Sequence, residues 1–215
     1  MTDHDDFAFE PIPGLPERPP VGEDILWQGR PSVWALAVEA FGLYWIAAYF
    51  VALALWRAST GFAEGGIGMA FAIGLPHLAL GVVVCAVVWL LAYAQAKAAM
   101  YTITSSRVVM RIGAALSVTY NLPFAQIAKA NLDLRKSGTG TIVLETLGDT
   151  KISYLVAWPH VRPWHLSRTQ PALRCIPGAA RVARVLTDAA EQRLSIPVIS
   201  RKDDAARPAG ALAAK

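Results

Sequence analysis

The sequence predicts an α+β membrane protein in which a two-helix transmembrane hairpin precedes a small antiparallel β-barrel or sandwich and a C-terminal amphipathic helix. Three observations predict this fold: two long apolar segments, six short β-like segments after them, and a helical apolar pattern near residue 185. Only 17% of the 215 residues are charged, against about 25% in a typical soluble domain. Because the deficit is concentrated in the apolar segments, it indicates membrane spans rather than a large core.

The N-terminal part leads from a polar arm into the first predicted span. Residues 1–31 contain six prolines, which favours an extended, largely irregular cytoplasmic arm, and the acidic first ten residues lack the apolar region of a signal peptide. Residues 32–56 carry a single charge, Glu39. As a helix they would extend ~37 Å, enough for a hydrocarbon core of ~30 Å. Trp34 and Trp56 occupy the ends, where interfacial aromatic residues are found.

The second predicted span follows a short loop. We expect a periplasmic loop at 57–70 and a helix at 71–95, in which Pro76 lies in the first turn or introduces a kink. Basic residues are concentrated outside the loop, which holds only Arg57. The positive-inside rule therefore predicts that both termini are cytoplasmic. The basic residues that flank the two spans are Arg18, Arg30, Lys97, Arg107 and Arg111.

The remainder, residues 98–194, is predicted to be a cytoplasmic β-domain. Alternating apolar residues separated by Gly-, Ser- and Pro-containing turns indicate antiparallel strands. The predicted strands are 101–104, 107–112, 116–122, 127–135, 141–147 and 151–156. We expect one residue from each strand in a common core: Ile103, Val109, Val118, Leu134, Val143 and Ile152.

Two further segments complete the predicted domain. A Pro- and Trp-rich strap covers residues 157–177, and an amphipathic helix covers 178–194. The spacing of Val182, Val185, Leu186 and Ala189 gives this helix one apolar face. The tail, 195–215, is predicted to be disordered.

Several polar residues allow a functional and a structural interpretation. Glu39 would cost about 2.5–3.5 kcal/mol at the centre of a span, so it either contacts a partner helix or lies at the interface near a helix N-terminus. His77 could ligate the magnesium of a chlorophyll, or lie at the far interface. His160 and His165 lack a third metal ligand. Their Trp- and Pro-rich strap therefore either packs across the β-domain or docks a partner.

Other chemistry finds little support in the sequence. There is no GxSxG, P-loop or HExxH motif, so we expect no enzyme. The two cysteines, Cys85 and Cys175, have no CxxC or Cys/His spacing, so neither a metal site nor a disulfide is expected. Residues 157–215 carry a net charge of +6 and residues 1–30 one of −5. The scattered basic residues suit an anionic membrane surface better than nucleic acid, and no cofactor is expected.

Particular segments resemble a known family. The stretches LWQGRP (26–31), MYTITSSRVVMRIG (100–113) and LPFAQIAKANLDLRKSGTGTIVLE (122–145) are similar to the bacterial pleckstrin-homology-like (PH-like, DUF304-type) membrane family. In that family a Tyr-x-x-Thr-x-x-Arg hairpin opens the β-domain, which corresponds here to Tyr101, Thr104 and Arg107. With WPHVRPWHLSRTQPALRCIP (158–177) and the final helix, the chain resembles PuhB-type photosynthetic-complex assembly proteins of purple bacteria over roughly residues 20–194.

The resemblance implies a non-enzymatic factor of the bacterial inner (intracytoplasmic) membrane that helps assemble the reaction centre and its core antenna. The implied partners are subunits of those complexes, and a homo-oligomer is compatible with the sequence. Two alternatives stay open: a generic membrane-anchored PH-like scaffold that binds lipid or protein, and a pigment or quinone carrier. The candidate partner contacts are Trp27, Arg30, Glu39, Trp158, His160, Arg162 and Trp164.

Overall fold

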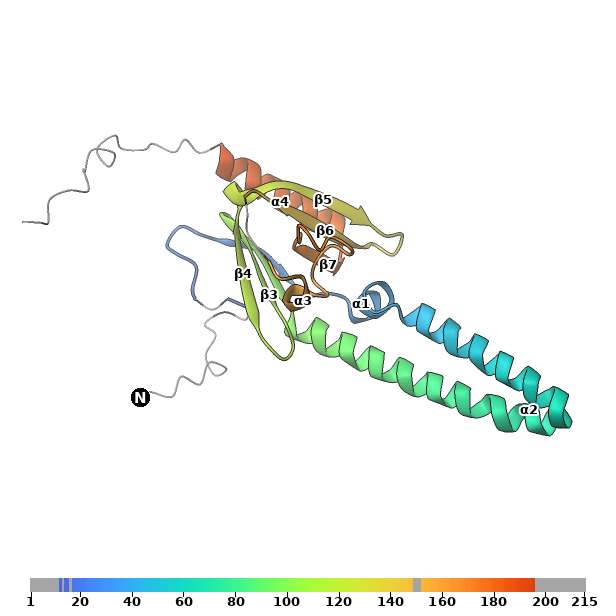
Figure 1. Cartoon of the computed structure of the whole chain (residues 1–215). Helices are drawn as coiled ribbons and strands as arrows, with labels where there is room; N and C mark the ends of the chain where they lie inside the picture. The colour runs from blue at the N-terminus through green and yellow to red at the C-terminus, as the bar shows by residue number, and fades with distance from the viewer. Residues whose placement is uncertain (1–11, 13, 16, 149–151, 196–215) are drawn as a thin grey trace, which may run out of the picture.

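The computed structural model describes residues 12, 14–15, 17–148 and 152–195. It consists of a β-rich domain from which one long helical element extends (Figure 1). The predicted arm before residue 12 and the predicted tail after residue 195 lie outside the described residues. The elements are β1 (Ile25–Gly29), α1 (Val33–Glu39), α2 (Leu43–Ala98), β2 (Met100–Thr104), β3 (Arg107–Ile112), β4 (Val118–Pro123), the 3-10 helix η1 (Phe124–Gln126), β5 (Ile127–Leu134), β6 (Thr139–Thr146), α3 (Tyr154–Ala157), β7 (Ala172–Pro177) and α4 (Ala179–Leu194).

The long element α2 reverses direction at Gly65 and Gly66, whose backbone angles are not helical. Gly66 has a φ of +70°, a conformation that residues with a Cβ rarely adopt. The turn divides α2 into two arms, residues 43–64 and 67–98, that run back alongside each other (Figure 1). At ~1.5 Å per residue the arms extend roughly 33 Å and 48 Å.

Small residues bring the two arms of α2 close together. A Cβ on Gly61 would lie 2.8 Å from the carbonyl oxygen of Met69, and one on Gly81 would lie 2.6 Å from Cβ of Phe50. Glycine at these positions therefore lets the opposing backbones approach, as in packed membrane helices. Within the described chain α2 is the one helix that is long and apolar enough to cross a membrane, by length and composition.

The sequence prediction for residues 32–70 differs from the structure in two places. The predicted first span is interrupted, because α1 ends at Glu39 and α2 begins after Gly42, which has a φ of +68°. The predicted loop, 57–70, is helical except at the turn. Its Ser and Gly residues suggested a loop, but the Ser59 hydroxyl donates to the Trp56 carbonyl at 2.7 Å. Such local bonds are compatible with a helix.

The first sheet contains four antiparallel strands in the order β1-β2-β3-β4. Strand β1 falls in the segment predicted to be irregular, and it pairs with β2 so that Gly29 faces Tyr101. Because β1 and β2 are neighbours, α1 and α2 are inserted between two paired strands. The sheet therefore holds both ends of the inserted segment together.

The Tyr-x-x-Thr-x-x-Arg segment stabilises this sheet through specific bonds. Oγ1 of Thr104 accepts the N–H groups of Ser106 and Arg107 at 3.2 and 3.1 Å, which closes the β2–β3 turn. The Arg107 guanidinium donates to both carboxylate oxygens of Glu23, at 2.8 and 3.0 Å. Burial acts to raise the pKa of Glu23, but hydrogen bonds from Arg107 and Thr104 outweigh it and hold that pKa below its usual range.

The second sheet contains three antiparallel strands in the order β5-β6-β7. Strands β4 and β5 belong to different sheets, so the described strands form no closed barrel. The α+β class and the antiparallel pairing are as predicted. Two elements differ: α3 occupies the second half of the predicted last strand, of which Lys151 lies outside the described residues, and β7 lies within the predicted strap.

The core lies between the two sheets and α4, whose Val182, Leu186 and Ala189 are buried in it as predicted. The six residues proposed for the core divide into four groups. Ile103 and Ile152 belong to it, and Val118 is half-buried. Val109 and Val143 are buried but face away from it, since their neighbours Val108, Met110, Ile142 and Leu144 are the core residues. Leu134, the last residue of β5, is 51% exposed.

Candidate functional site

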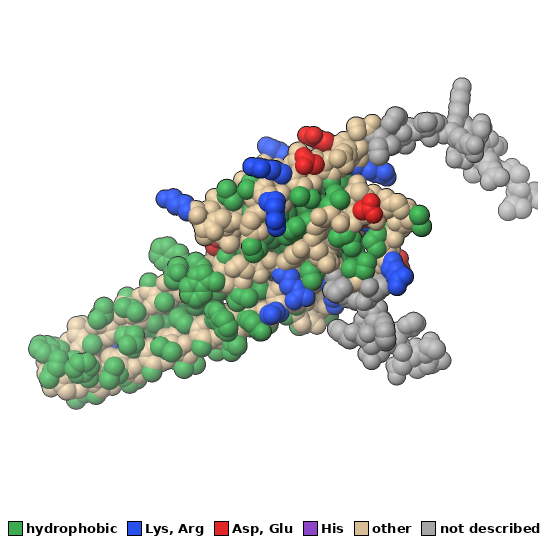
Figure 2. Space-filling view, turned by 180° about the vertical axis from the view of Figure 1, so that it is seen from behind, with side chains coloured by type: hydrophobic (Ala, Val, Ile, Leu, Met, Phe, Trp, Pro, Cys, Tyr) green, Lys and Arg blue, Asp and Glu red, His purple; other side chains and the backbone are tan. Residues whose placement is uncertain are grey.

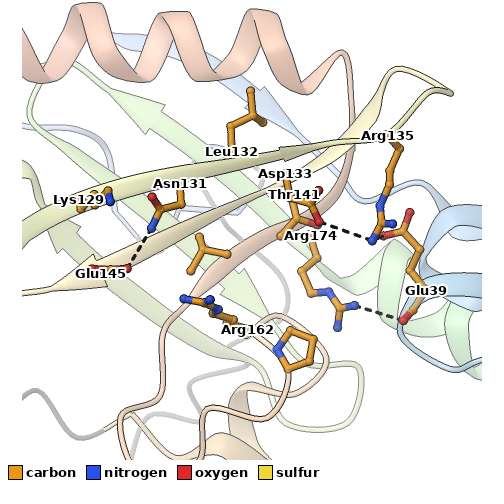
Figure 3. A pocket seen from close by; sticks show the side chains of 12 residues that line it. Glu39, Lys129, Asn131, Leu132, Asp133, Arg135, Thr141, Glu145, Arg162 and Arg174 are labelled. Carbon is orange, nitrogen blue, oxygen red and sulfur yellow. Dashed lines mark hydrogen bonds and ion pairs between the residues drawn. The ribbon is translucent and has the colours of Figure 1, made fainter.

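A charged cleft of about 590 Å³ lies between the C-terminal end of α1 and the outer face of the second sheet (Figure 3). Alternate residues of β5 and β6 point into it, because successive side chains of a strand face opposite sides. The strap contributes one wall, and β7 contributes the floor. The cleft is lined by Glu39, Lys129, Asn131, Leu132, Asp133, Arg135, Thr141, Val143, Glu145, Arg162, Pro163 and Arg174.

Glu39 points into this cleft, not into an apolar helix pair. Its Oε2 atom lies 3.4 Å from Nη2 of Arg135, and the Cys175 thiol donates to the same oxygen at 3.7 Å. Burial, followed by the Glu39 charge, raises the pKa of Cys175 to about 12. The thiol is therefore protonated and unreactive at neutral pH. Because Arg135 is half-exposed, its ion pair with Glu39 contributes little stability.

Arg174 is the most buried cation of the cleft, with 6% of its surface exposed. Its guanidinium donates to the Pro159 carbonyl at 3.1 Å and to the Glu39 carbonyl at 3.4 Å. The latter bond satisfies an orphan carbonyl at the end of α1, where a cation is favoured. Among the described residues, no carboxylate forms an ion pair with Arg174 or Arg162. Arg162 donates to Oε1 of Gln170 at 3.0 Å, so both guanidinium groups have neutral partners and their positive charges are not neutralised by a carboxylate of the described residues.

Beneath the cleft, His160 and Tyr101 form a buried pair. The Tyr101 hydroxyl lies 2.6 Å from Nδ1 of His160 and accepts the backbone N–H of Arg174 at 3.3 Å. Burial raises the pKa of Tyr101, while burial and the nearby Arg174 charge lower the pKa of His160 to about 3. Both side chains are therefore neutral, and the pair is a structural link between β2 and the strap.

The predicted contact residues do not form one site. Glu39 and Arg162 line the cleft, and His160 is buried below it. Trp158 packs edge-on against Phe41, with ring centroids 5.0 Å apart.

The other three predicted contacts lie elsewhere. Trp164 is 87% exposed on the strap, with a φ of +63°. Trp27 and Arg30 belong to the β1 region, where Trp27 is half-buried and Arg30 is exposed. Sequence reasoning missed Arg135 and Arg174, although the alternation of Lys129, Asn131 and Asp133 could have indicated a polar strand face.

The other two histidines of the described part of the chain, His77 and His165, have local partners. Nδ1 of His77 lies 2.8 Å from the Ile73 carbonyl oxygen, one turn earlier on the second arm. Nδ1 of His165 lies 2.9 Å from the Pro163 carbonyl oxygen. Within the described residues, no cluster of three or more His, Cys, Asp or Glu side chains could hold a metal ion.

A four-stranded and a three-stranded antiparallel sheet, with a C-terminal helix packed against them, make the β-rich part a PH-like domain. The sequence profile of the bacterial PH domain family matches residues 33–190, and the chain belongs to this family. It is 47% identical over 201 residues to an uncharacterized 23.7 kDa protein in the puhA 5' region of Rhodobacter capsulatus, covering 93% of this chain and 94% of that protein.

A solved structure also matches part of the chain. It is a DUF1696 family protein with a pleckstrin-homology domain from Shewanella loihica PV-4. The match has 9% sequence identity and a TM-score of 0.29, and it covers 43% of this chain and 71% of that one.

Proposed function

We propose that α2 anchors the protein in a membrane, with its two arms as a transmembrane hairpin. The outer faces of both arms carry large exposed apolar side chains, such as Trp45 (82%), Leu55 (67%) and Val82 (66%). Figure 2 shows the arms covered mostly by hydrophobic side chains, while acidic and basic side chains gather on the β-rich domain. An apolar surface of this extent is unfavourable in water and suits a bilayer.

Aromatic residues near the base of the arms support an interface at that level. Trp34 contacts Tyr44 at a centroid distance of 6.1 Å, and Trp89 stacks on Tyr93 at 5.6 Å. Lys97 lies over the Tyr93 ring. Tryptophan, tyrosine and lysine are enriched at membrane interfaces, and the excess of Lys and Arg on this side favours a cytoplasmic PH-like domain.

We further propose that the protein is a non-enzymatic assembly factor for the photosynthetic reaction centre and its core antenna. The observation that carries this proposal is the 47% identical relative in the puhA 5' region, a region of a photosynthesis gene cluster. The architecture suits such a role, because β1 and β2 tie the membrane arms to the domain. The charged cleft beside α1 would then meet subunit segments as they leave the bilayer.

The test is affinity purification of the tagged full-length protein from cells induced for photosynthetic growth, after solubilisation in mild detergent. We expect reaction-centre or core-antenna polypeptides to be recovered, and fewer of them with Arg162→Gln, which leaves the buried bonds of Arg174 in place. Recovery of neither class of polypeptide would contradict the assembly role and favour a generic PH-like scaffold. Bound pigment that is lost with His77→Ala would instead favour the pigment-carrying alternative.

A further inference from the structure

The short segment formed by α3 and Trp158, where the strap begins, is called here the strap corner. It exposes apolar side chains that do not belong to the core. Leu155 is 85% exposed, Val156 is 48% exposed and Trp158 is 37% exposed. Their neighbour Ala157 is buried in the core, so the short helix α3 is fixed to the domain and presents these three side chains outward. Exposed apolar side chains that gather in one place are more typical of interaction surfaces than isolated ones are.

Contacts fix this corner beside the base of both arms of α2. Trp158 packs against Phe41, which lies two residues before the start of α2. Two residues further on, His160 contacts Tyr101, which lies three residues after the end of α2. The strap corner therefore lies beside the place where the arms join the domain.

A second segment exposes an apolar side chain near the same place. In the register of the first sheet, Met100, the first residue of β2 after the second arm, pairs with Arg111 of β3. The chain then continues past this level into the β3–β4 turn, residues 113–117, which carries Leu116 at 79% exposure. Figure 1 shows α3 and the β3–β4 turn close to the domain end of α2.

We propose that Leu155, Val156, Trp158 and Leu116 form a membrane-contact surface that rests in the headgroup region of the bilayer crossed by α2. This inference rests on the proposed insertion of α2. We choose a lipid bilayer as the occupant, because these residues lie beside the base of the apolar arms. Tryptophan beside aliphatic side chains is also the composition of interfacial segments. Such a contact would hold the PH-like domain in one orientation on the membrane.

The test uses the full-length protein in nanodiscs of phosphatidylcholine and phosphatidylglycerol, with nitroxide labels on single cysteines. The background carries Cys85→Ala and keeps Cys175, which is buried and, with a pKa of about 12, labels poorly. The test variants are Leu155→Cys and Leu116→Cys. Leu80→Cys, on the second arm, reports insertion of α2. Leu147→Cys is the matched control, since Leu147 is 54% exposed. It directly follows the C-terminal end of β6, whereas Arg135, which contacts α1, lies beside the opposite end of that strand.

Each label is compared by its collision rates with molecular oxygen, which partitions into lipid, and with a water-soluble nickel chelate. We expect Leu80 to be protected from nickel, Leu147 to be freely accessible to it, and Leu155 and Leu116 to be several-fold less accessible than Leu147. If Leu155 and Leu116 match Leu147 while Leu80 is protected, the membrane-contact surface is wrong and the anchor stands. If Leu80 is also accessible to nickel, both the anchor and this surface are overturned.

Discussion

The hydroxyl oxygen of Tyr101 lies 2.6 Å from Nδ1 of His160, although 59 residues separate them in the sequence. Tyr101 is the second residue of β2, which directly follows the second arm of α2, and His160 belongs to the strap. The same hydroxyl accepts the N–H of Arg174 from β7. One buried oxygen therefore joins the arm, the strap and the second sheet.

Removing this hydroxyl should destabilise the domain. Tyr101→Phe leaves Nδ1 of His160 and the N–H of Arg174 without their partner, and an unsatisfied buried polar group costs about 1–3 kcal/mol. Thermal unfolding of the purified full-length protein should show a clear loss. Tyr120→Phe is the matched control, because the Tyr120 hydroxyl makes no hydrogen bond within the described residues. Equal melting of both variants would contradict the structural role of Tyr101.

The His160 pKa predicts loss of stability in acid. The folded value is about 3 against 6.5 for a free histidine, so below pH 6.5 the unfolded chain binds a proton that the folded chain refuses. The contribution of His160 to the free energy of unfolding is therefore fully present above pH 6.5. It falls as the pH drops toward 3, by roughly 2–3 kcal/mol between pH 6.5 and 4.5.

His160→Gln should remove this part of the pH dependence, measured as the free energy of unfolding from pH 7.5 to 4.5. His165→Gln, on the same strap, should keep the wild-type profile. A wild-type profile in His160→Gln would show that another group causes the acid sensitivity.

The two arginines around Glu39 should differ strongly in their effect on stability. Arg135→Gln removes a half-exposed ion pair and should cost at most about 1 kcal/mol. Arg174→Met leaves the Pro159 and Glu39 carbonyl groups without a donor in a buried place, and should cost about 2–3 kcal/mol. Chemical denaturation of the two variants under the same conditions measures the difference. Equal losses would mean that the Arg174 bonds are not made.

Two leucine substitutions can check which side chains of β5 and β6 face the core. Leu144 is fully buried and Leu134 is half-exposed, so Leu144→Ala should cost about 2–5 kcal/mol and Leu134→Ala less than about 1 kcal/mol. The melting temperatures of the two variants measure this difference in stability. A larger loss at Leu134 would restore the core assignment that the sequence pattern suggested.

His77 offers a test of the pigment alternative within the membrane arm. The Nδ1 bond to Ile73 leaves Nε2 of His77 free within the described residues, so geometry alone does not decide between the two roles. Because an assembly factor contributes no ligand to the finished complexes, we expect His77→Ala to leave the level and the absorption spectrum of photosynthetic complexes near normal. Absorption spectra of membranes from a strain that carries this variant provide the measurement. A shifted spectrum would favour a pigment-carrying protein.

Local patterns predicted those elements whose formation depends on nearby residues. Helix α4 and the β2–β3 hairpin follow from periodicity and turn residues, and the apolar stretch of α2 follows from composition. Strand β1 could not be found in this way, because its partner β2 lies more than seventy residues away. Gly42, the one glycine between α1 and α2, could not be recognised as a helix break because it lies within an apolar segment.

The core and the cleft likewise depend on contacts between residues that are distant in the sequence, which local patterns do not reveal. A slip of one residue reverses every side chain of a strand, which is why Val109 and Val143 were assigned to the wrong face. The polar alternation of Lys129, Asn131 and Asp133 could have indicated one wall of the cleft. Arg174 carried no signal, since its role depends on the distant carbonyl groups of Glu39 and Pro159.

The most direct test of the assembly proposal is the amount of reaction-centre complex in a photosynthetic host from which the gene has been deleted. A factor that acts on subunits in transit contributes no atom to the finished complex. We therefore predict a lower content of complex with an unchanged absorption spectrum, restored by the full-length gene. A normal content of reaction-centre complex after deletion would contradict the account.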